Sequence, residues 1–140
     1  MHSIKSTWTT KMAFDNEIGN HTVRTDTGAP LGDDTGASPK RLLLAGLAGC
    51  SGIDIISILD KMRVKLDNLI IDVEADLTDE HPKVYSHIRM TYHFSGTAIK
   101  RSKIEKAVDL SQHKYCGVSA MLRKNCPIDY EILIEGEVEG

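Results

Sequence analysis

The chain has 140 residues and a formal net charge of −3, with a sequence pI near 6.0. This length suits one domain with one core, over residues 1–140, or a dimer whose two chains share a core. The mildly acidic balance, with no cluster of basic residues, argues against a nucleic-acid-binding protein, because contact with phosphates needs clustered Lys and Arg. The N-terminal residues lack the apolar segment of a secretion signal, so we expect a cytoplasmic protein.

The sequence contains three cysteines, Cys50, Cys116 and Cys126. An odd number of cysteines in a reducing compartment argues against a fixed disulfide framework and leaves free thiols, a redox pair or metal ligation. The cysteines are far apart, no CxxC motif occurs, and the histidines show no HxxxH spacing. We therefore expect neither a metal site nor a bound cofactor.

The N-terminal segment shows the alternation of a half-buried strand. Over residues 4–14 the even positions are mostly apolar, with Trp8 among them. Residues 16–20 predict a hairpin turn into a second strand at 21–25. Gly, Asp and Pro then dominate residues 27–37, which predicts a loop leading to the next helix.

A long apolar helix is predicted over residues 38–63. Ser38 and Pro39 are typical of an N-cap and a first helical position. From residue 42 onward the segment is apolar on nearly every side, which indicates a helix buried within protein. Asp54 and three glycines interrupt the run and argue against a membrane span. Because glycine is costly in a helix, these glycines mark a close approach of another backbone or a ligand, and Cys50 lies among them (Gly46, Gly49 and Gly52).

Five further elements are predicted after this helix. They are, in order, a strand at 69–77, a strand at 84–94 that Gly96 ends, a helix at 104–115, a short helix at 118–122 and a strand at 128–134. The order predicts an α+β protein in which antiparallel sheets pack around the buried central helix. A helix that is apolar all round needs more cover than one small sheet and one amphipathic helix provide. We therefore predict an intimate homodimer.

Two stretches of the sequence resemble one known superfamily. LLLAGLAGCSGIDIISILDKM surrounds Cys50, and SQHKYCGVSAML surrounds Cys116, 66 residues later. With the order of elements, they are similar to the superfamily of osmotically inducible protein C (OsmC) and organic hydroperoxide resistance protein (Ohr), and to its OsmC-like branch. The resemblance implies the OsmC-like fold over nearly the whole chain and an intertwined homodimer with its sites at the interface.

The resemblance also implies a thiol peroxidase. In the peroxidase members, the cysteine of the central helix attacks the hydroperoxide and the later cysteine resolves the product. Carried over to this chain, Cys50 becomes a sulfenic acid and condenses with Cys116 to a disulfide. A dithiol, lipoyl in kind, then reduces that disulfide. The apolar surroundings of Cys50 favour an organic hydroperoxide over hydrogen peroxide.

The sequence departs from the peroxidase pattern at the residues that activate the thiol. In those members an arginine from the N-terminal strands does this, held by a glutamate about ten residues before the first cysteine. Arg24 is the candidate for the arginine, but Lys40 stands where the glutamate is expected. The alternative for Arg24 is an ordinary strand arginine in solvent. Cys126, just before Pro127, fits a small buried residue better than a redox role.

Two other functions stay open. A dimer that binds an apolar small molecule between its central helices, with little or no peroxidase activity, would account for the missing glutamate. A purely structural subunit is the third possibility, and two thiols at both family positions argue against it.

Overall fold

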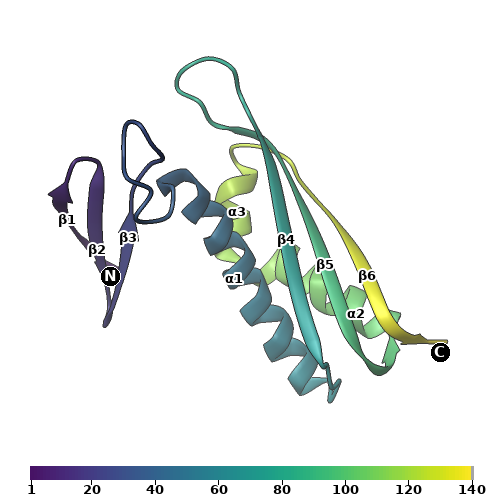
Figure 1. Ribbon diagram of the computed structural model, residues 1–140. Helices are drawn as coiled ribbons and strands as arrows, with labels where there is room; N and C mark the ends of the chain where they lie inside the picture. Colours follow the sequence, from purple (N-terminus) through teal and green to yellow (C-terminus); the bar gives the residue numbers. More distant parts are fainter. Residues whose placement is uncertain (140) are drawn as a thin grey trace. The chain divides into compact units, whose positions relative to one another are not determined.

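The structure is a computed structural model that describes residues 1–139. The described chain forms two compact units, one at residues 1–45 and one that begins at Gly46. The prediction of a single domain over residues 1–140 stays a prediction. The elements, coloured along the chain in Figure 1, are β1 (Lys5–Thr10), β2 (Ala13–Ile18), β3 (His21–Thr25), α1 (Pro39–Lys61), β4 (Asn68–Leu77), β5 (Tyr85–Lys100), α2 (Arg101–Leu110), a π-helical turn η1 (Ser111–Tyr115), α3 (Gly117–Arg123) and β6 (Ile128–Val138). This content confirms the predicted α+β class.

The first unit contains an antiparallel sheet with the strand order β1-β2-β3. The single strand predicted over residues 4–14 is wrong, because the chain turns at Lys11 and Met12 between β1 and β2. Lys11 has a φ of 50°, the left-handed conformation used in tight turns. The apolar alternation continues through this turn, so the pattern did not reveal it. Trp8 is 63% exposed rather than half-buried.

The loop after β3 is fastened by Asp26, whose side chain is buried. The N–H of Asp26 donates to the carbonyl of Ala37 at 3.1 Å. Its carboxylate accepts the N–H of Thr27 at 2.7 Å, and the N–H and hydroxyl of Thr35 at 3.0 and 2.7 Å. These bonds, chiefly from the Thr35 hydroxyl, lower the pKa of Asp26 to about 2. The predicted loop is therefore an ordered structure closed on a carboxylate.

The second unit is built on a sheet in which β5 lies between β4 and β6. β4 and β5 are antiparallel, as predicted, whereas β6 pairs parallel with β5. The parallel pairing arises because the connection from β5 to β6 crosses over through α2 and α3 (Figure 1). The prediction that Gly96 ends this strand is wrong, because β5 continues past it. An irregular pairing between Ser95 and Ile99 carries the strand on to Lys100.

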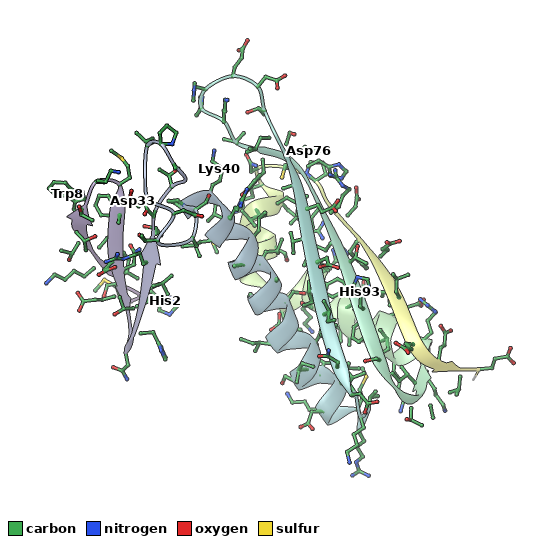
Figure 2. The ribbon with its side chains drawn as sticks, viewed as in Figure 1. His2, Trp8, Asp33, Lys40, Asp76 and His93 are labelled. Atoms are coloured by element: carbon green, nitrogen blue, oxygen red, sulfur yellow. The ribbon has the colours of Figure 1, made fainter. Side chains whose placement is uncertain are left out.

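The two faces of this sheet differ as the sequence indicated. The β5 side chains on the covered face are at most 2% exposed (Ile88, Met90, Tyr92 and Phe94). The other face carries partly exposed ion pairs, including His93 with Asp72 at 2.9 Å and Arg89 with Asp76 at 2.8 Å. Figure 2 shows His93 along the sheet and Asp76 nearer to the loop between β4 and β5. The covered face is the one that contacts helix α1, where the hydroxyl of Tyr92 lies 2.6 Å from that of Ser51.

Within one chain, helix α1 is buried on one face and exposed on another. Its buried residues recur every four positions (Leu47, Ser51, Ile55 and Leu59). Ile53 and Ile56, by contrast, are 74% and 50% exposed. A single chain therefore leaves part of this apolar helix uncovered, as the sequence analysis expected. By length and composition α1 could cross a membrane, but this is weak evidence because core helices of soluble proteins pass the same test.

We expect Asp26→Asn to destabilise the protein at neutral pH and to matter less in acid. The folded-state pKa of Asp26 lies below its ordinary value of 3.8, so its stabilisation is present above that value and is lost as the pH falls toward about 2. Chemical unfolding followed by circular dichroism at pH 7, above that range, and at about pH 2.5, where most of the stabilisation is lost, measures the difference. Asp34→Asn, at an exposed position in the same loop, is the matched control. An equal loss from both variants would contradict the prediction.

Candidate functional site

Two of the predicted site residues, Cys50 and Cys116, lie together in the second unit. Their sulfurs and a carboxylate oxygen of Asp54 all lie within 4.8 Å of one another. Cys50 and Asp54 are one turn apart on α1 and so share a face of the helix. Cys116 comes from the segment between η1 and α3. Cys50 is partly exposed, whereas Cys116 is 3% exposed, and both are free thiols.

The π-helical turn η1 delivers Cys116 to this cluster. The N–H of Cys116 donates to the carbonyl of Ser111, five residues earlier, at 2.8 Å. Cys116 then adopts an extended backbone, with φ −75° and ψ 103°, and becomes the N-cap of α3. Its sulfur accepts the N–H of Ser119 at 3.4 Å. Burial, followed by the neighbouring Cys50, raises the pKa of the Cys116 thiol against the lowering effect of that bond.

A chain of hydrogen bonds leads from Asp54 into the core. The hydroxyl of Ser111 lies 3.3 Å from Oδ2 of Asp54 and 2.9 Å from the hydroxyl of Ser51. The Ser51 hydroxyl lies 2.6 Å from the phenolic oxygen of Tyr92. Ser111, Ser51 and Tyr92 are all fully buried, so each hydroxyl depends on these contacts in place of water.

The series of hydrogen bonds continues from Tyr92 to the guanidinium of Arg123. Nε2 of Gln112 donates to the Tyr92 hydroxyl at 2.6 Å, and Nη2 of Arg123 donates to Oε1 of Gln112 at 2.6 Å. We call this series, from Arg123 through Gln112, Tyr92, Ser51 and Ser111 to Asp54, the Arg123–Asp54 chain. It joins α3, η1, β5 and α1 through polar atoms at the centre of the second unit.

The acceptors at one end give the Arg123–Asp54 chain a direction. The Ser111 hydroxyl lies 3.3 Å from both the Asp54 carboxylate and the backbone carbonyl of Ser51, and both groups only accept. Because each hydroxyl has one proton, Ser51 then donates to Ser111, and Tyr92 donates to Ser51. As far as Ser111, every bond therefore points away from the guanidinium, and neighbouring bonds polarise one another in the same sense. The proton of Ser111 is shared between the Asp54 carboxylate and the Ser51 carbonyl.

Arg24, the third predicted site residue, lies on β3 in the first unit. Its Nε donates to Oδ1 of Asp15 at 2.8 Å and its Nη2 to Oδ2 at 3.3 Å. This bond from Arg24 lowers the pKa of the Asp15 carboxyl. Asp15 lies directly opposite Arg24 on β2. The sequence analysis missed Asp15 because it joined residues 4–14 into one strand and so gave no register for β2. The role of Arg24 as activator stays a prediction.

Sequence reasoning also missed Asp54 as a member of the site. The available signal was its spacing of four residues from Cys50 on a predicted helix. From the sequence alone, the charge of Asp54 argues only against a membrane span. Cys126 is 5% exposed and its N–H bonds the carbonyl of Leu122 at 3.1 Å, in keeping with the buried position predicted for it.

Comparisons with known proteins agree on one family. Residues 32–131 match a family model described as OsmC-like protein. Over 102 residues the chain is 34% identical to Protein YhfA of Escherichia coli K12, covering 71% of this chain and 76% of YhfA. A hypothetical protein from Aquifex aeolicus VF5 has a similar structure, with a TM-score of 0.83, 27% identity and coverage of 96% of this chain and 98% of that chain.

The fold is also similar to that of an organic hydroperoxide resistance protein OsmC from Legionella pneumophila. The TM-score is 0.71 over 95% of this chain and 96% of that chain. At 17% identity this likeness shows the fold alone.

We expect Tyr92→Phe to lower the free energy of unfolding by about 1–3 kcal/mol, because it removes the hydroxyl at the middle of a buried chain and strands its partners. Urea unfolding measures the loss. The matched control is Tyr115→Phe, which removes a hydroxyl from a side chain that is 53% exposed. Equal stability of Tyr92→Phe and the wild type would show that the hydrogen bonds of the Arg123–Asp54 chain do not stabilise the fold.

Proposed function

Because the chain belongs to the OsmC-like family, we propose that it is a cysteine-based peroxidase that reduces organic hydroperoxides through Cys50 and Cys116. The observation that carries this proposal is the placement of both sulfurs within 4.8 Å of each other. A disulfide bond is about 2.05 Å long, so the two sulfurs still have to approach before they bond. The resemblance to Ohr proteins supplies the substrate class.

In the proposed reaction, Cys50 is the group that meets the peroxide. It is partly exposed, whereas Cys116 is almost completely covered. The Cys50 thiolate attacks one oxygen of ROOH, the O–O bond breaks, and the products are Cys50 sulfenic acid and the alcohol ROH after proton uptake. The thiol of Cys116 then displaces water from the sulfenic acid and forms the disulfide. A dithiol, lipoyl in kind, restores both thiols and is itself oxidised to a disulfide.

Arg24 is the cation proposed to favour the thiolate of Cys50. In the family's peroxidases a glutamate holds this arginine, and Lys40 cannot do so. Asp15 supplies a carboxylate in place of that glutamate, and its two hydrogen bonds with Arg24 fix the guanidinium. This pairing supports the assignment because a fixed, planar guanidinium presents its remaining N–H groups in a constant direction.

A homodimer is the proposed assembly. The exposed face of α1 carries glycines in its middle and isoleucines farther along (Gly46, Gly49, Ile53 and Ile56). A Cβ atom added at Gly46 or Gly49 would meet nothing within 4 Å in this chain, so this part of the helix surface is open. Small residues allow a second helix to approach closely, and exposed isoleucines gain by being covered. A second copy of α1 fits both features.

One observation favours the second candidate, a dimeric binding protein without fast peroxidase chemistry. The group that lies with the two sulfurs is the Asp54 carboxylate, whereas the family's peroxidases place an arginine beside the first cysteine. Under this alternative a small molecule binds between the central helices of the dimer and the thiols stay reduced. Absence of turnover in the wild-type protein with every dithiol tested would favour it.

The peroxidase proposal predicts different defects for the two cysteines. With cumene hydroperoxide and a dihydrolipoyl reductant, Cys50→Ser will abolish turnover. Cys116→Ser will consume one equivalent of peroxide and then stop, because the sulfenic acid cannot be resolved. Cys126→Ala, which removes the remaining thiol, is the control and will turn over normally. Turnover by Cys50→Ser would remove the mechanism.

The same assay, in single-turnover form, also examines Arg24. Arg24→Ala will slow the oxidation of Cys50, and Arg24→Lys will restore part of the rate because it keeps the charge and loses the two-pronged pairing. An unchanged rate in Arg24→Ala would leave Arg24 as an ordinary strand residue.

The dimer proposal predicts that Ile53→Asp will convert the assembly to monomers or greatly weaken it, because a carboxylate would be buried between helices. Analytical ultracentrifugation at micromolar concentration measures the assembly. Ile70→Asp places the same charge at another exposed isoleucine, on β4, and will leave the dimer intact. A wild-type protein that is monomeric under these conditions would overturn the proposal.

A further inference from the structure

We propose that the reduced Cys50–Asp54–Cys116 cluster is a site for a single Zn²⁺ ion. The cluster combines two thiol sulfurs and one carboxylate oxygen, a donor set that zinc accepts. Residue spacing alone does not indicate such a site, because Cys116 is more than 60 residues from the other two ligands and no usual zinc spacing occurs. The fold brings the three side chains together.

The geometry of the cluster suits a small ion. Cys50 and Asp54 are four residues apart on α1, the spacing at which two side chains of a helix reach the same metal. The ligand atoms lie within 4.8 Å of one another. Around tetrahedral zinc, with bonds of about 2.3 Å to sulfur and about 2.0–2.2 Å to oxygen, such atoms are separated by about 3.4–3.8 Å. The side chains therefore need to close by roughly an ångström.

The surroundings already hold the ligands in place. Ser111 lies 3.3 Å from Oδ2 of Asp54, and the other lone pairs of the carboxylate stay available. The sulfur of Cys116 accepts the N–H of Ser119 at 3.4 Å. Hydrogen bonds of this kind orient ligands around metal ions. Here the group behind Asp54 is the Ser111 hydroxyl, the last member of the Arg123–Asp54 chain before the carboxylate.

The donor set favours zinc over other common ions. Two thiolates alone suit Cu(I), but the carboxylate is a hard ligand that a soft ion does not need. Magnesium and calcium prefer oxygen ligands and avoid thiolates. Three protein ligands leave the fourth position of a zinc ion open to water or a small molecule, and the partial exposure of Cys50 gives access from solvent.

Zinc binding and oxidation of the cysteine pair would exclude each other. When Zn²⁺ binds, the two thiols lose their protons and become ligands. When a hydroperoxide oxidises the pair, the two sulfurs give up two electrons and form a disulfide. These electrons, with two protons from solvent, reduce the O–O bond to alcohol and water, and both sulfur ligands are lost. The ion is then released. The inference concerns the same residues as the proposed peroxidase, but the binding itself does not require turnover.

The experiment titrates the reduced, metal-free protein with Zn²⁺ against a chromogenic chelator and repeats the titration with Co²⁺. We expect one ion per chain, together with the sulfur-to-cobalt absorption band that reports thiolate ligation. Cys50→Ser and Cys116→Ser will each lose this site. Asp54→Asn, which keeps the shape and both thiols, will weaken binding by more than about tenfold, since even groups behind the ligands cost 10–100-fold.

Two variants serve as matched controls. Asp60→Asn removes the same charge from an exposed position on the same helix, and Cys126→Ala removes the third thiol. Both will bind zinc as the wild type does. Loss of binding in Cys126→Ala, unchanged binding in Asp54→Asn, or binding of far less than one ion per chain would overturn the proposal. Circular dichroism confirms that each variant is folded.

Addition of cumene hydroperoxide to the zinc-loaded protein gives the link to redox chemistry, and we expect release of one ion as the disulfide forms. A strong chelator keeps the protein free of zinc, so peroxide turnover measured in its presence tests the peroxidase proposal independently of the zinc site. Zinc binding without turnover would overturn the peroxidase alone, and turnover without zinc binding would overturn the zinc site alone.

Discussion

The hydroxyl group of Ser51 is the contact on which the candidate site depends. It lies 2.6 Å from the hydroxyl of Tyr92 on β5 and 2.9 Å from that of Ser111 at the start of η1. It therefore joins the central helix to the sheet and to the segment that carries Cys116. Because Ser51 follows Cys50 directly in α1, the same contact that packs the helix also sets which way Cys50 faces. The fold and the site share one polar centre, which is uncommon among cores made of apolar residues.

Most of the fold followed from local patterns in the sequence. The helix at 38–63, the strands at 69–77 and 84–94 and the helical segments around Cys116 are present, and their periodicity and flanking residues were sufficient to place them. The failures have specific causes. The apolar alternation continues through the turn at Lys11, so the pattern does not reveal the turn. The continuation of β5 beyond Gly96 depends on its pairing with β6, and no local sequence pattern encodes that pairing. The family resemblance supplied the pairing of Cys50 with Cys116, which spacing alone could not.

The polar residues of the site were harder to predict because they become meaningful only in three dimensions. Ser51, Ser111 and Tyr92 are separated by tens of residues, and each alone looks like an ordinary helix or strand position. Asp54 next to the two thiols gives this chain a local charge unlike that expected for a simple thiol peroxidase. Arg24 and Asp15 form a self-contained pair on the N-terminal strands.

The π-helical turn Ser111–Tyr115 has a consequence for how relatives of this chain should be aligned. A turn of this kind holds about one more residue than a turn of α-helix. Deleting one residue there would rewind the segment to ordinary α-helix and rotate everything after it by about 100° around the axis. Cys116 would then be carried around to another side of the helix, although its identity would be unchanged. The position of the Cys116 sulfur thus depends on the chain length across these five residues.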